Sequence, residues 1–134
     1  MTRPHERALL DTSVVIDHPA SAVAAHASTA AVSTITLAEL SYGLHTPDPL
    51  LNAAREQRYH WITNAFDPIP FDTRAARVYG ALCATVRAVS RDPKPRRFDL
   101  LIAAVALSLG IPLITRNEAD FTGIHDALTI IAVR

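Results

Sequence analysis

Residues 98–115 read FDLLIAAVALSLGIPLIT, and this stretch decides the fold class. Apart from Asp99 its first part is almost wholly apolar. It predicts a buried helix over residues 99–110 that ends at Gly110, since glycine is the usual residue just past a helix end. Residues 112–115 then predict a short buried strand. A buried helix followed at once by a short apolar strand is typical of α/β proteins with a parallel sheet.

The remainder of the chain repeats this alternation of helices and short strands. We expect further helices over residues 21–27, 36–44, 49–66 and 73–90. We expect further strands over residues 8–10, 31–35 and 128–133, with a turn at residues 12–17 and an extended piece at residues 68–71. We find no repeat or linker that divides the chain, so we expect residues 1–134 to form one domain. The sequence predicts a three-layer α/β/α sandwich with a short, mostly parallel sheet.

Composition excludes several classes of protein. Apolar residues make up 49% of the chain and charged residues 19%, which excludes a disordered chain. The single cysteine, Cys83, excludes a disulfide-stapled module and a cysteine-based zinc cluster, and we expect it in the core. No signal peptide or membrane-spanning apolar run is found, so we expect a cytoplasmic protein with no membrane contact. Equal numbers of basic and acidic residues neither favour nor exclude a polyanionic partner.

Four acidic residues lie where parallel α/β sheets form their sites, at the carboxyl ends of strands. Asp11 ends the first strand, and Glu39 falls in the first turn of the helix after the second. Asp99 opens the apolar helix, and Asp120 lies in the loop after the strand at 112–115. Clustered carboxylates repel one another unless a cation neutralises them, and oxygen ligands favour Mg²⁺ or Mn²⁺. This pattern predicts metal-assisted phosphodiester hydrolysis, with metal-activated water as the nucleophile.

Each acid also has a purely structural explanation. Asp11 could cap the turn that follows it, and Asp99 could complement a helix dipole. Thr36 and Glu39 have the spacing of a helix capping box, which is the simpler explanation of Glu39 taken alone. Asp120 could be a solvated loop acid. The placement of all four at strand ends favours a shared site over four coincidences.

Four blocks of the sequence resemble the PIN-domain family, and within it the VapC-type toxins of bacterial toxin–antitoxin pairs. They are LLDTSVVID (9–17), STITLAEL (33–40), RRFDLLIAA (96–104) and ITRNEADF (114–121), in the order found in that family. The resemblance covers nearly the whole chain. It implies a PIN-like fold and a Mg²⁺-dependent endoribonuclease, with Mn²⁺ as a substitute ion. It also implies a homodimer that a cognate antitoxin inhibits.

The resemblance also implies the roles of individual residues. The catalytic and metal-binding acids are Asp11, Glu39, Asp99 and, as our choice for the fourth, Asp120. The auxiliary polar residues are Ser13, Thr115 and Asn117. The candidates for RNA contacts are Arg97 and Arg116, with a solvated loop as the alternative for the bases that precede Asp99. We expect the antitoxin to dock at an apolar groove near Tyr42, Leu44 and Leu50.

Two other functions remain as alternatives. One is a non-catalytic PIN-like binding module whose acids only cap helices. The other is a different α/β phosphohydrolase with Asp11 as the nucleophile. One class of such enzymes needs a second acid two residues after the nucleophile, and Ser13 stands at that position. Another class needs a lysine at the end of a late strand, but the only lysine, Lys94, lies in a loop.

Overall fold

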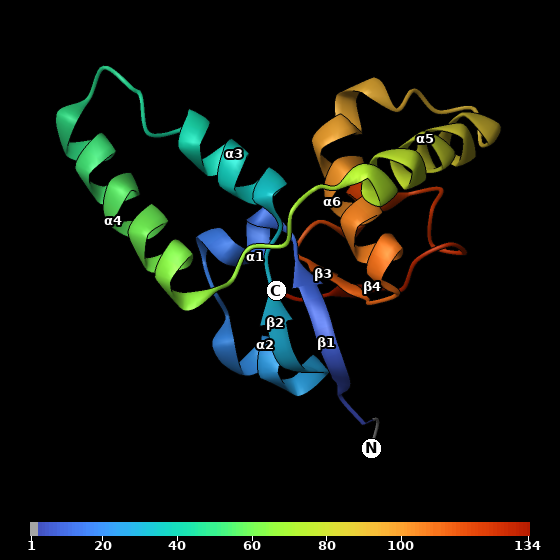
Figure 1. Cartoon of the computed structure of the whole chain (residues 1–134), viewed down its shortest axis with the longest axis horizontal. Coiled ribbons are helices and arrows are strands. Elements are labelled where there is room, and N and C mark those ends of the chain that lie inside the picture. Colours follow the sequence, from blue (N-terminus) through green and yellow to red (C-terminus); the bar gives the residue numbers. More distant parts are fainter. Residues whose placement is uncertain (1–2) are drawn as a thin grey trace.

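A parallel sheet runs through the computed structural model, which describes residues 3–134 (Figure 1). Its strands are β1 (His5–Leu10), β2 (Ala27–Ala31), β3 (Leu113–Thr115) and β4 (Ile130–Ala132). Their order across the sheet is β2-β1-β3-β4, and every neighbouring pair is parallel. On β1, Leu9 pairs with Ala31 on one side and with Leu113 on the other. The first strand is therefore internal, and its carboxyl end lies at the middle of one sheet edge.

Helices cover both faces of this sheet and give the predicted three-layer sandwich. They are α1 (Thr12–Ile16), α2 (Ala20–His26), α3 (Thr34–Tyr42), α4 (Pro49–Ala65), α5 (Thr73–Ala88) and α6 (Arg97–Leu109), with 3₁₀ turns η1 (Lys94–Arg96) and η2 (Glu118–Phe121). Buried side chains of α5 and α6 pack with Leu9 and Leu113 on one face. Those of α1, α2 and α4 pack with Ala8, Leu10 and Ile114 on the other. Successive residues of β1 thus serve opposite cores, as the alternation of a strand requires.

The helix that decides the fold class ends as predicted. Gly110 follows α6 with a φ of 67°, in the left-handed region that glycine adopts most readily. Cys83 is buried in the core beside this helix, as expected. Across residues 3–134, none of the helices combines the length and apolar character that crossing a bilayer needs.

The prediction of a strand over residues 31–35 is wrong. The strand lies earlier, and Ser33 caps α3 by accepting a hydrogen bond from the backbone N–H of Thr36 at 3.3 Å. This contact satisfies a free N–H at the start of the helix. Residues 34 and 35 are therefore helical, although β-branched residues at these positions favour a strand. The predicted turn at residues 12–17 is largely the short helix α1. The expected extended piece is present, and Ile69 forms a parallel bridge to Ser33.

The carboxyl ends of the strands face one region of the molecule. In Figure 1 they point toward the space between the α3–α4 pair and the α5–α6 pair. Asp11 follows the last residue of β1, and Thr115 is the last residue of β3. This is the edge at which parallel α/β sheets place their sites.

Candidate functional site

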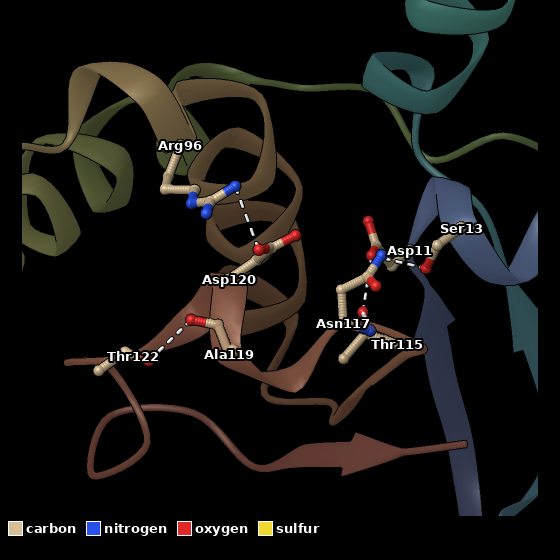
Figure 2. Close-up of polar contacts among 8 residues, drawn as sticks. All are labelled: Asp11, Ser13, Arg96, Thr115, Asn117, Ala119, Asp120 and Thr122. Atoms are coloured by element: carbon tan, nitrogen blue, oxygen red, sulfur yellow. Dashed lines mark hydrogen bonds and ion pairs between the residues drawn. The ribbon is translucent and has the colours of Figure 1, made fainter. Parts of the chain in front are cut away.

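Asp11 is the most deeply buried of the four acids, with 4% of its surface exposed. Its Oδ1 accepts a hydrogen bond from the backbone N–H of Thr12 at 2.9 Å, which caps α1. Its Oδ2 accepts hydrogen bonds from Thr115 Oγ1 at 2.7 Å and from Ser13 Oγ at 3.0 Å (Figure 2). The capping explanation of Asp11 is therefore correct but incomplete. The two hydroxyls fix its carboxylate where β1 and β3 end.

Glu39 is linked to the region of Asp11 by the next residue, Thr12, whose Oγ1 donates a hydrogen bond to Glu39 Oε1 at 2.8 Å. Thr12 Oγ1 also lies 3.0 Å from Thr36 Oγ1, and Thr36 must donate there because the single Thr12 proton goes to Glu39. Glu39 lies in the second turn of α3, not the first, and Ser33 caps the helix, so the predicted capping box does not form. Partial burial raises the pKa of Glu39; the Thr12 hydrogen bond opposes that rise, and the Asp11 charge adds to it.

Asp99 lies half-buried in the first turn of α6. Its pKa is raised from the ordinary 3.8 to about 7, chiefly by burial; the charges of Asp11, Asp120 and Glu39 contribute to the rise in that order, and Arg96 opposes it. Within residues 3–134 no group donates a hydrogen bond to its carboxylate. A helix dipole alone would lower the pKa at this position, so the dipole does not explain Asp99. The charges of the other three acids all act on Asp99, so the four carboxylates share one electrostatic environment.

Asp120 lies on η2 and is paired with an arginine. Arg96 Nη1 is 3.1 Å from Asp120 Oδ1 (Figure 2). Asn117 precedes η2, and its backbone N–H donates to Thr115 Oγ1 at 3.0 Å. Figure 2 shows the Asn117 side chain turned toward Asp11. Both residues therefore lie at the acidic edge, but Asp120 already has a counter-charge.

The two arginines predicted to contact RNA are engaged elsewhere. Arg116 Nη2 donates to the backbone oxygen of Asp17 at 2.8 Å and lies 3.5 Å from its Oδ2. The Arg97 guanidinium lies 5.6 Å from the ring centroid of Phe98, within cation–π range. Arg116 still supports the site through its backbone N–H, which donates to Ser13 Oγ at 3.2 Å.

Sequence reasoning missed the roles of Thr12 and Arg96. No local pattern distinguishes Thr12 from any hydroxyl residue at a helix start, because its partner Glu39 is 27 residues away. Arg96 did carry a usable signal. It precedes Asp99 by three residues at the start of a helix, a spacing that places two residues on one face.

The donor set suits a hard divalent cation. All candidate ligands offer carboxylate, hydroxyl or amide oxygens, which Mg²⁺ and Mn²⁺ prefer. Among residues 3–134, no three His, Cys, Asp or Glu side chains already form a group that could hold an ion. Asp99 nevertheless lacks a donor, and its pKa is raised first by burial and then by the charges of the other three acids, which a divalent cation would offset. The residues therefore fit such an ion in chemistry and in charge.

Comparisons with known proteins agree on one family. A family model described as the PIN domain matches residues 8–124. The chain is 31% identical to a VapBC-5 chain from Mycobacterium tuberculosis, a member of the VapBC family of toxin–antitoxin systems, with a TM-score of 0.82 over 95% of this chain and 98% of that one. VapBC-1 from nontypeable Haemophilus influenzae matches at 26% identity, with a TM-score of 0.76 over 94% of this chain and 97% of that one. FitAcB from Neisseria gonorrhoeae shares the fold at 22% identity, with a TM-score of 0.72 over 92% and 95% of the two chains. Comparison with curated proteins gave no significant match.

Proposed function

The chain belongs to the PIN-domain family, within its VapC-type toxins, and on that premise we propose that it is a Mg²⁺-dependent endoribonuclease and the toxin of a toxin–antitoxin pair. VapC-type proteins are nucleases. RNA as the substrate and Mg²⁺ as the ion, with Mn²⁺ as a substitute, are the finer parts of the proposal. One observation carries it. Four carboxylates from separate segments lie at one sheet edge, and the charges of three of them raise the pKa of the fourth, Asp99.

The ion would be held by Asp11, Glu39, Asp99 and Asp120, with Asn117 as an auxiliary ligand. When bound, a divalent cation activates water and neutralises charge on the scissile phosphate. The chain's own hydroxyl groups orient the ligands before the ion or the RNA arrives. Ser13 and Thr115 hold Asp11, and Thr12 holds Glu39. Ligands fixed in this way need little reorganisation when the transition state forms.

Incubation of the purified protein with total cellular RNA tests the proposal. We expect discrete cuts with Mg²⁺ or Mn²⁺ that EDTA abolishes and that Asp99→Ala loses. Asp126→Ala, which changes an exposed acid outside the site, is the matched control and should cut like the wild type. Because water is the nucleophile, the fragments should carry 5′-phosphate and 3′-hydroxyl ends. Fragments with 2′,3′-cyclic phosphate ends, or cutting that survives EDTA, would contradict the mechanism.

We also propose a homodimer in the cytoplasm, inhibited by a cognate antitoxin. The similar Mycobacterium tuberculosis structure is of a toxin–antitoxin system. Tyr42, 89% exposed, lines an apolar pocket of about 430 Å³ with Ala38, Phe98 and Glu39. Leu44 and Leu50, predicted to form the antitoxin groove with Tyr42, do not line this pocket, so we assign antitoxin docking to the Tyr42–Phe98 pocket itself. Tyr42→Ala should weaken antitoxin binding about tenfold in a titration, since exposed aromatic residues often dominate such interfaces.

Two alternative functions, a non-catalytic binding module and a phosphohydrolase, can be compared with this structure. A non-catalytic module is favoured by the Arg96–Asp120 pair, which neutralises one acid without a metal. Failure of Mg²⁺ and Mn²⁺ to raise the melting temperature would support that alternative. A phosphohydrolase with Asp11 as nucleophile is disfavoured, because Ser13 stands two residues after Asp11 in place of a second acid, and the only lysine of the sequence, Lys94, lies in η1 and not at a strand end.

A further inference from the structure

A pocket of about 200 Å³ lies beside Glu39, between α3 and α4, and two arginines line it. Arg55 Nη1 donates to the backbone oxygen of Gly43 at 2.7 Å, so this arginine fastens α4 to the end of α3. Arg58 is half-buried in the same pocket, and within residues 3–134 its side chain has no hydrogen bond or ion pair. A guanidinium carries five N–H donors, so Arg58 presents unused donors next to the acids.

A second pocket, of about 280 Å³, lies beside Asp120 and is also lined by two arginines. Arg96 is occupied by Asp120 at 3.1 Å. Arg91 is exposed, and in the described part of the chain only its backbone N–H is engaged, donating to Val86 at 3.2 Å. Each pocket thus pairs one structural arginine with one unoccupied arginine.

The two pockets lie on opposite sides of the acids. Glu39 belongs to α3, which lies with α4 on one side in Figure 1, and the second pocket lies where η2 meets the segment between α5 and α6 on the other. Both volumes fall below the roughly 300–1,000 Å³ of small-molecule pockets, so each suits one unit of a longer chain better than a whole ligand. A polyanionic strand that approaches four carboxylates also needs positive charge on its flanks, and arginine is the residue best suited to phosphate.

We propose that Arg58 and Arg91 bind backbone phosphates on the two sides of the scissile phosphate, so that an RNA strand crosses the acids from the α3–α4 side to the α5–α6 side. This inference rests on the proposed ribonuclease function and adds the path of its substrate. It assigns substrate binding to arginines other than Arg97 and Arg116, whose guanidinium groups have other contacts.

Steady-state cleavage of a labelled single-stranded RNA at several salt concentrations tests the path. Arg58→Gln and Arg91→Gln should each raise KM about tenfold, the loss of one charge-assisted contact, and leave kcat near the wild-type value. Each should also reduce the slope of log KM against log salt by about 0.7, the value for one phosphate contact on a single strand. The matched control is Arg7→Gln, which removes an exposed arginine from β1 near the opposite edge of the sheet. It should change neither quantity.

A binding measurement keeps the test independent of catalysis. Fluorescence anisotropy of the same RNA is measured in an Asp99→Asn background, with Arg58→Gln, Arg91→Gln or Arg7→Gln added. Weaker binding in the first two but not in the third supports the path. A wild type that cuts no RNA would overturn the proposed function. Unchanged KM, salt slope and RNA affinity in the two arginine variants would overturn the path alone.

Discussion

Replacing Asp99 by asparagine should stabilise the metal-free protein while it abolishes activity. Asp99 is half-buried and lies in the field of Asp11, Asp120 and Glu39, and no protein group in residues 3–134 donates a hydrogen bond to it. Asparagine keeps the shape of the side chain and removes its charge. The substitution should remove both the cost of burying a charge and the repulsion by the other acids, and it should also remove a metal ligand.

The size of the gain follows from the pKa of Asp99. A rise from 3.8 to about 7 is about three units, or at most about 4 kcal/mol at pH 8. Asp99 is only half-buried, so solvent screening reduces this figure to roughly 2 kcal/mol. In a domain of this size, that gain raises the melting temperature by about 5–10 °C.

The gain should depend on pH in one direction. The folded-state pKa of Asp99 is raised, so the wild type loses stability as pH rises from 3.8, where the unfolded chain ionises, to about 7, where the folded protein does. The advantage of Asp99→Asn should therefore be complete at pH 8 and shrink steadily toward pH 5.

Thermal unfolding in EDTA between pH 5 and pH 8 measures this difference. The wild type is compared with Asp99→Asn and with Asp126→Asn, whose exposed side chain lies outside the site. Asp126→Asn should melt with the wild type at every pH. An Asp99→Asn protein no more stable than the wild type at pH 8, or a gain that does not vary with pH, would refute the reasoning.

Three further predictions concern the ion, the hydroxyl contacts and the core. Mg²⁺ affinity, measured by calorimetry, should fall about tenfold from pH 8 to pH 6, because the ion binds ionised carboxylates and Asp99 gains a proton over that range; an affinity independent of pH would contradict this. Thr12→Val removes the hydrogen bonds to Glu39 and Thr36 and should lower the free energy of unfolding in urea by about 1–3 kcal/mol, whereas a loss below 0.5 kcal/mol would show that neither bond matters. Ile62→Ala should cost about 2–5 kcal/mol in the same assay, because Ile62 is the buried residue by which α4 packs on the sheet; a change within error would place α4 outside the cooperative core.

Much of the fold could be predicted from local patterns because the buried elements carry clear signals. The apolar run of α6 and its Gly110 end, and the proline at the start of α4, place those helices within two residues. The strand β2 could not be found in this way. Its sequence, ASTAA, has little strand preference, and it is a strand because its backbone pairs with β1 from His5 to Leu9.

The acids of the candidate site could be predicted for a topological reason. Strands that run parallel end at one edge, and Asp11, Glu39 and Asp120 come after strands that end there. Asp99 begins α6, the helix that leads into β3, so it lies at the end of that helix far from the start of the strand. The contacts that orient those acids follow no such rule. Thr115 donates to Asp11 across 104 residues, and Arg96 reaches Asp120 from a different element. Such pairings depend on side-chain directions that only the folded chain defines.

The central claim is that the four carboxylates form one divalent-metal site. Titration of Mn²⁺ at pH 8 by calorimetry tests it most directly, with wild type, Asp126→Asn as the control, and four single variants: Asp11→Asn, Glu39→Gln, Asp99→Asn and Asp120→Asn. The account predicts saturable binding in the wild type and the control, weakened at least tenfold by each of the four substitutions. Undiminished binding in those variants, or no binding by the wild type, would contradict it.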